Sequence, residues 1–136
     1  GGIVSTDTSN GLATLIEHDL PETETRVTAA LAAEGFGVLT RIDVSETLRN
    51  KIGAEIEEYV ILGACNPPLA HRALEHSRRV GLLLPCNVVL RAVDGGTQVE
   101  AVDPRTLLPA DDQAMCDLAD DAAARLSRAL TAAAAA

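Results

Sequence analysis

The chain has 136 residues, which is enough for one domain and short for two. Its formal net charge of −9 comes from 20 acidic residues against 11 lysines and arginines, and its only aromatic residues are Phe36 and Tyr59. This charge repels nucleic acid and anionic membrane surfaces, and the aromatic side chains on which single strands stack are missing, so we expect no nucleic acid and no membrane as partner.

Residues 1–10 are polar and rich in turn-forming residues, so we expect a loose N-terminal segment. Residues 11–18 have the apolar alternation that is typical of a strand. A helix should begin at Asp19, because Asp19 and Glu22 have the spacing of a capping box and Pro21 fits the first turn. Gly35 is suited to end this helix in a left-handed conformation.

A second strand is predicted at 36–44, followed by a short helix at 46–52 that Ser45 would cap. Residues 55–64 then form a buried strand. Asn66 is a good N-cap for the next helix, which should run to about residue 77. Pro67 fits the first helical position, because the N–H group that proline lacks has no helical partner there.

The sequence Asp94-Gly95-Gly96, between apolar runs at 82–93 and 97–102, predicts a β-hairpin. A last helix is expected from about 111 to 130, with its apolar residues on one side. The alanine tail at 132–136 should fray, because it has little apolar surface to bury.

The predicted elements form one α+β domain over 11–131, a mainly antiparallel sheet covered by helices in the order β-α-β-(short α)-β-α-β-β-α. No linker or internal repeat divides it. The sequence has no run of 18 apolar residues, no phosphate-binding glycine loop and no closely spaced set of metal ligands. We therefore predict no membrane span, no cofactor and no metal site.

Cys65 follows the predicted strand at 55–64 and comes directly before the helix that Asn66 and Pro67 begin. The unpaired N–H groups of a helix N-terminus favour an anion, so this position would favour the thiolate, which is the nucleophilic and metal-binding form of cysteine. A simpler interpretation is a small buried residue at a tight turn. On the residues alone, the simpler interpretation comes first.

Cys86 lies within the apolar run 82–93, on the same predicted strand face as Leu84 and Val88, while Asn87 points to the opposite face. Pro85 cannot donate a hydrogen bond to a neighbouring strand, so it marks a strand edge or a bulge. A thiol in the core is the first interpretation here, unless Cys65 lies close by.

The two cysteines could form a redox pair, but 20 residues lie between them, and a disulfide needs Cα atoms within about 7 Å. A zinc site that added His71 would still lack a fourth ligand. Three cysteines at irregular spacing make no disulfide framework, so we expect reduced thiols and a cytoplasmic protein, although a removed leader would leave no trace. Lys51 is the only lysine, and it could balance the dipole of its short helix or hold an anion.

The segments "LRNKIGAEIEEYVILGACNPPLAHRAL" and "GLLLPCNVVLRAVDGG", followed by "VEAVDP", resemble the bacterial and archaeal family called domain of unknown function 302. The resemblance runs from about Phe36 to Leu108, and Ala64-Cys65-Asn66-Pro67 and Leu84-Pro85-Cys86-Asn87 are its most specific parts. It implies a small α+β domain that pairs as a homodimer and has no firmly assigned activity. Both cysteines and Lys51 match the family pattern, so the resemblance favours a functional site at Cys65 over a core thiol.

Our first functional hypothesis is a small homodimeric binding or sensing domain that takes an anionic or thiol-bearing ligand at the turn after the third strand. The candidate site residues are Cys65, Asn66, Pro67, Cys86, Asn87 and Lys51. An enzymatic alternative is a thiol-dependent redox or sulfur-transfer protein, with Cys65 as nucleophile and Cys86 as resolving partner. The third alternative is a structural or interaction domain whose dimer surface is its function.

Overall fold

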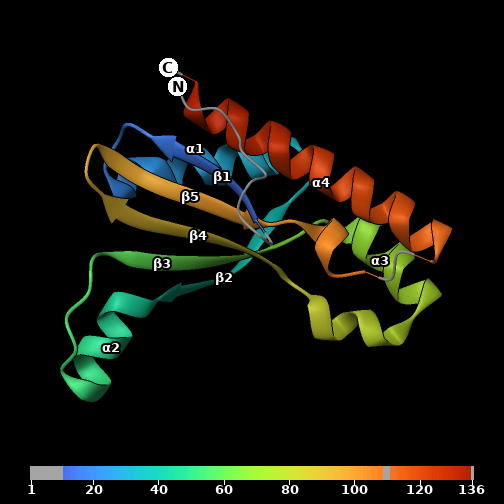
Figure 1. Ribbon diagram of the computed structural model, residues 1–136, viewed down its shortest axis with the longest axis horizontal. Coiled ribbons are helices and arrows are strands. Elements are labelled where there is room, and N and C mark those ends of the chain that lie inside the picture. Colours follow the sequence, from blue (N-terminus) through green and yellow to red (C-terminus); the bar gives the residue numbers. More distant parts are fainter. Residues whose placement is uncertain (1–10, 109–110, 136) are drawn as a thin grey trace.

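The computed structural model describes residues 11–108 and 111–135. Within this part of the chain, five antiparallel strands form one sheet in the order β1-β5-β4-β3-β2 (Figure 1). The strands are β1 (Gly11–Ile16), β2 (Gly37–Asp43), β3 (Tyr59–Cys65), β4 (Cys86–Val93) and β5 (Gly96–Val102). The predicted α+β class and the predicted order of elements are confirmed.

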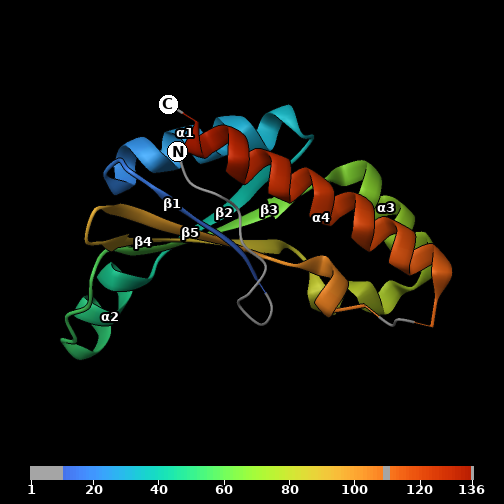
Figure 2. The same ribbon diagram turned by 45° about the horizontal axis from the view of Figure 1, so that its top comes forward.

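Four α-helices and two short 3₁₀ helices connect or follow the strands in the described residues. They are α1 (Leu20–Ala33), α2 (Val44–Ile52), α3 (Pro67–His76), η1 (Arg78–Leu83), η2 (Pro104–Thr106) and α4 (Gln113–Ala134). Helices α1 and α4 lie side by side over one face of the sheet, and α3 lies beside α4 at one end (Figures 1 and 2). Helix α2 extends from the other end of the molecule. None of these helices is long and apolar enough to cross a membrane.

The core forms where alternate residues of the strands meet the apolar sides of α1 and α4. In β3 and β4, Leu62 lies opposite Val88 and Val60 opposite Leu90, and all four side chains are buried. Because strand side chains alternate between the two faces, this register puts one set of aliphatic residues under the helices. The predicted β-hairpin is also present, with Val93 opposite Gly96.

The helix ends follow their local sequence signals, with one correction. The side chain of Asp19 caps α1 by accepting from the Glu22 N–H at 3.0 Å, and Gly35 has the expected positive φ of 87°. The predicted cap of α2, Ser45, lies inside the helix, and Asp43 caps it instead by accepting from the Glu46 N–H at 2.9 Å. Ser45 donates to the Asp43 carboxylate, so it supports the cap from the first turn.

Two predicted strands begin later than expected. Strand β3 starts at Tyr59, after an irregular segment at 53–58, and residues 82–85 are not part of β4. The Leu82-Leu83 pair ends the 3₁₀ helix η1, and β4 starts at Cys86. Pro85 has no N–H group for the sheet ladder, so regular pairing begins only after it.

The prediction that the alanine tail frays is wrong for the described part of 132–136. Helix α4 continues to Ala134, and the side chains of Ala133 and Ala134 are buried in the main core cluster. The helix lies along α1 and β1, so the sheet and α1 supply the apolar surface that the tail lacks by itself. The predicted loose segment at 1–10 lies outside the described residues.

Candidate functional site

The two cysteines of the predicted site lie at the same end of the sheet. Ala64, next to Cys65, is directly opposite Cys86 in the β3–β4 pairing, and Cys65 is opposite Gly37 of β2. The β3 chain continues through Asn66 into α3, while β4 starts at Cys86 after η1. Two cysteines with 20 residues between them are thereby brought to one corner of the fold. Both cysteines are free thiols.

Asn66 joins this corner to the end of α1. Its side-chain oxygen accepts from the Leu69 N–H at 3.3 Å, which is the predicted N-cap, and its side-chain nitrogen donates to the Glu34 carbonyl at 3.2 Å. The residue is 7% exposed. Because both ends of the amide have partners, Asn66 fixes the turn and has little hydrogen-bonding capacity left for a ligand.

A close approach between Gly63 and Pro85 holds the start of β4 against β3. A Cβ on Gly63 would lie 2.8 Å from Pro85 Cγ and closer still to Thr40 Oγ1. Only a residue without a side chain leaves this space for the proline ring. Because Gly63 leaves room for Pro85, it helps to set the position at which Cys86 enters the sheet.

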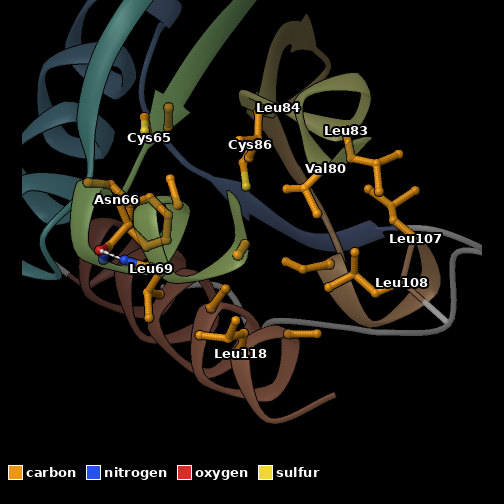
Figure 3. A pocket seen from close by; sticks show the side chains of 17 residues that line it. Cys65, Asn66, Leu69, Val80, Leu83, Leu84, Cys86, Leu107, Leu108 and Leu118 are labelled. Carbon is orange, nitrogen blue, oxygen red and sulfur yellow. Dashed lines mark hydrogen bonds between the residues drawn. The ribbon is translucent and has the colours of Figure 1, made fainter. Parts of the chain in front are cut away.

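An apolar pocket of about 80 Å³ opens between this corner and the helices α3, η1, η2 and α4 (Figure 3). Seventeen residues line it: Phe36, Ala64, Cys65, Asn66, Leu69, Ala70, Ala73, Val80, Leu83, Leu84, Cys86, Pro104, Leu107, Leu108, Leu118, Ala119 and Ala122. Apart from one amide and two thiols, all of these side chains are hydrocarbon. Figure 3 shows Cys86 and Leu118 on opposite sides of the space, with Val80 and Leu108 on a third side.

The electrostatics of the pocket keep the Cys86 thiol protonated. Burial, with a smaller contribution from nearby Cys65, raises the pKa of Cys86 from 9.0 to about 11. Burial in apolar surroundings disfavours the thiolate because the charge loses its hydration. At neutral pH, Cys86 is therefore a small, nearly apolar group on the pocket wall.

Asp103 positions the η2 side of the pocket. It is buried, accepts from the Arg105 N–H at 3.0 Å and forms an ion pair with the Arg105 guanidinium, with Nη2 2.7 Å from Oδ2. These hydrogen bonds hold the pKa of Asp103 below its usual value. The cap directs the chain through Pro104 to Leu107, which both line the pocket.

The structure brings together Cys65, Asn66 and Cys86 but not the other predicted site residues. Pro67 begins α3 as predicted and is exposed, outside the pocket lining. Asn87 is also exposed, since it points away from the face that carries Cys86. Lys51 lies on α2, at the opposite end of the molecule from α3 (Figure 1).

The histidine considered for a metal site points elsewhere. His71 is exposed and forms an ion-pair contact with Glu75, with Nε2 2.9 Å from Oε1. Within the described residues, no group of three or more His, Cys, Asp or Glu side chains is arranged so that it could hold a metal ion.

Sequence reasoning missed the aliphatic walls of the pocket. The sequence predicts Leu83 within the strand run 82–93 and predicts no element at Leu107 and Leu108. The signal that could have found them is the position of the leucines in the sequence. One run comes directly before Pro85 and a leucine pair follows Asp103-Pro104, and these residues carry turn or cap signals. Such a run indicates apolar side chains on short irregular segments, which need a partner surface.

Comparison with known proteins identifies related chains but no function. The family described as "Domain of unknown function DUF302" matches residues 12–133. The chain is similar to an uncharacterized conserved DUF302 protein from Bacillus stearothermophilus, known from a crystal structure, with a TM-score of 0.85 and 32% sequence identity. That similarity covers 91% of this chain and 98% of the other. No curated protein matches. The resemblance predicted from residues 36–108 is confirmed over a longer range.

Proposed function

We propose that this chain, which belongs to the DUF302 family, is a small-molecule binding domain that takes an apolar group into the pocket between α3 and α4. The observation that carries the proposal is the lining of the pocket, where no charged side chain takes part. Ligand sites in proteins are concave and mostly apolar, with a few polar groups that orient the ligand. Here the two thiols are the polar groups open to a ligand, because the Asn66 amide is already bonded to the Leu69 N–H and the Glu34 carbonyl.

The volume of the pocket limits what it can hold. At about 80 Å³, the pocket has roughly half the volume of an apolar cavity of about 150 Å³ that takes up benzene or xenon. A pocket of this kind is suited to the end of an aliphatic chain or to a small apolar molecule. It is too small for a nucleotide or an aromatic cofactor.

The lining also selects among the ligands that the sequence predicted. An anion at the N-terminus of α3 would need free N–H groups, but Asn66 already accepts from the Leu69 N–H. An anion that entered the pocket would lose its hydration, and the protonated Cys86 thiol and the hydrocarbon side chains offer no positive charge to compensate for that loss. For the pocket itself we therefore favour an apolar group over an anionic one.

Xenon under pressure tests this proposal, because dry apolar cavities bind xenon. Methyl-resolved NMR of the labelled protein should show shifts at Leu69, Val80 and Leu118, which line the pocket. Methyl groups of the main core, such as those of Leu12 and Val99, should not move.

A filled pocket provides the control for the xenon experiment. Ala119→Leu places its added carbons in the pocket, whereas Ala124→Leu makes the same change on an exposed position of α4. The first variant should abolish the xenon shifts and the second should keep them. Shifts that spread evenly over core methyl groups, or that persist in a folded Ala119→Leu variant, would contradict the proposal.

A thiol-dependent redox function is the second candidate, because two free cysteines lie at one corner of the sheet. The raised pKa of Cys86 counts against it, since the thiolate is the attacking form in thiol–disulfide exchange. In this hypothesis Cys65 attacks a disulfide of a partner, forms a mixed disulfide and releases one thiolate. Cys86 then attacks the Cys65 sulfur, releases the second thiolate and leaves a Cys65–Cys86 disulfide. Mass spectrometry after treatment with oxidised glutathione would detect that product, and its absence would remove this candidate.

We also propose that the chain pairs as a homodimer. Six large hydrophobic side chains are exposed in the part of the chain that the structure describes. Four of them lie on β2, α2 and the segment that follows: Leu39, Ile42, Ile52 and Ile56. Leu39 is 67% exposed and Ile52 74%. Exposed apolar residues grouped on neighbouring elements are typical of interaction surfaces. Light scattering should give twice the mass of one chain, and Ile52→Glu should reduce it to that of a monomer.

The cytoplasm remains our proposed compartment. Cys65 and Cys86 are free thiols in the structure, and free thiols persist in the reducing conditions of a cytoplasm.

A further inference from the structure

A second hollow lies against the outer side of the pocket wall. It is an open groove of about 420 Å³, and it shares Val80, Leu83, Leu107 and Leu108 with the pocket. Figure 3 shows these four side chains gathered on one side of the pocket. A chain that leaves the pocket between them would therefore enter the groove.

The groove is itself partly apolar and open to solvent. Leu82, which lines only the groove, is 81% exposed, and Leu107 is 38% exposed. Such side chains would gain from contact with a hydrocarbon chain, because each would lose apolar surface to water. The groove can thus continue the apolar path that begins in the pocket.

The groove also carries a cation that has no ion-pair partner among the described residues. Arg79 lines it, and no described carboxylate lies within 4.0 Å of its guanidinium. Residues 71–79 contain three arginines and two histidines against one glutamate, in a chain whose net charge is −9. Of these basic residues, His76 and Arg79 line the groove itself.

The one carboxylate of the groove is already engaged. Asp112 Oδ2 lies 2.5 Å from His76 Nε2, and Asp112 Oδ1 accepts from the Met115 N–H as the cap of α4. Asp112 is therefore held at the end of α4 and is not the partner of Arg79. An arginine with an open guanidinium fork is well suited to a carboxylate from outside the chain.

We infer that the ligand is an aliphatic carboxylate, whose chain end occupies the pocket, whose middle lies in the groove and whose carboxylate pairs with Arg79. This inference rests on the proposed function, since it needs the pocket to accept an apolar group. It adds the chemical class of the ligand, an aliphatic carboxylate, and it assigns recognition of the charged end to Arg79. The anion predicted from the sequence would thus bind at the groove rather than at the turn of Cys65.

Calorimetric titration with three probes of equal chain length tests the inference: octanoate, n-octanol and octylamine. Octanoate should bind about fivefold more tightly than octanol, which is the effect expected for one exposed ion pair, and octylamine should bind most weakly. Arg79→Gln should remove the advantage of octanoate over octanol, and Arg79→Lys should keep most of it. Arg49→Gln, which makes the same charge change on α2, should leave all three affinities unchanged.

The pocket-filling variant separates failure of this inference from failure of the proposed function. Ala119→Leu should weaken octanoate and octanol alike; if it does not fold, Ala122→Leu fills the same pocket from a half-exposed position. Equal affinity for octanoate and octanol, unchanged by Arg79→Gln, would overturn the role of Arg79 and leave the apolar pocket standing. Xenon binding without binding of either chain probe would overturn the ligand class. Absence of xenon binding as well would overturn the proposed function itself.

Discussion

The raised pKa of Cys86 predicts a loss of stability at alkaline pH that one substitution should remove. In the folded protein this pKa is about 11, against 9.0 for an ordinary cysteine, mainly because the thiol is buried. Between these two values the folded protein holds a proton that the unfolded chain has lost. The stabilising contribution is therefore complete below pH 9 and is lost as the pH rises to about 11.

The size of the effect follows from the shift. One pKa unit corresponds to 1.36 kcal/mol, so two units correspond to about 3 kcal/mol of unfolding free energy. For a domain with a total stability of about 5–15 kcal/mol, such a loss is large enough to move a denaturation midpoint clearly.

Urea denaturation of wild type and Cys86→Ala, at about pH 8 and about pH 11, measures this contribution. Other groups also titrate in this range, so the quantity to follow is the unfolding free energy of wild type minus that of Cys86→Ala. This value should be roughly 2–3 kcal/mol lower at the higher pH, because only wild type carries the buried thiol. Cys116→Ala retains Cys86, so it should keep the loss of stability that the Cys86 thiol causes between the two pH values.

Two results would refute the reasoning. One is a wild-type curve that stays parallel to that of Cys86→Ala across the range. The other is rapid alkylation of Cys86 at neutral pH, at the rate seen in the urea-unfolded chain. The shift implies a thiolate fraction about a hundredfold lower in the folded protein.

Three further substitutions test the packing around the site, each by chemical denaturation. Asn66→Ala should cost about 2 kcal/mol, through loss of the α3 cap and of the hydrogen bond to the Glu34 carbonyl; Asn66→Asp keeps the cap but turns a carboxylate oxygen toward that carbonyl, so it should cost at least as much. Gly63→Ala should cost about 1–3 kcal/mol because its methyl group would overlap Pro85, whereas Gly37→Ala, with nothing within 4 Å, should cost under about 1 kcal/mol. Ala134→Asp should destabilise the protein by at least about 1 kcal/mol and Ala132→Asp much less, since only the first is buried; equal costs would argue that the α4 end is frayed.

Local sequence signals predicted the elements that depend on local chemistry. Asp19 and Asn66 cap their helices as expected, and the Asp94-Gly95-Gly96 turn forms the expected hairpin. The side chain of a cap reaches N–H groups only three residues away, and a tight turn involves two neighbouring strands, so both are visible in the sequence.

Two errors arose where a distant segment changed the outcome. The alanine tail has little to bury by itself, yet Ala133 and Ala134 are buried because α4 reaches the core beside α1 and β1. Residues 82–85 are apolar enough for a strand, yet η1 takes Leu83 to the pocket, and Pro85 packs where Gly63 leaves space. In both cases the deciding neighbour lies far away in the chain.

The amino-acid sequence alone therefore determined the class of the fold, the caps of α1 and α3, and the two cysteine motifs as candidates. The tertiary structure decided which candidates meet: it placed Cys65, Asn66 and Cys86 at one corner and left Lys51 and Asn87 away from it. It also surrounded that corner with aliphatic residues from α3, η1, η2 and α4, which makes the site apolar. The physical reason is that the pairing of strands and the packing of helices join residues distant in sequence, and the hydration of a thiol depends on those neighbours.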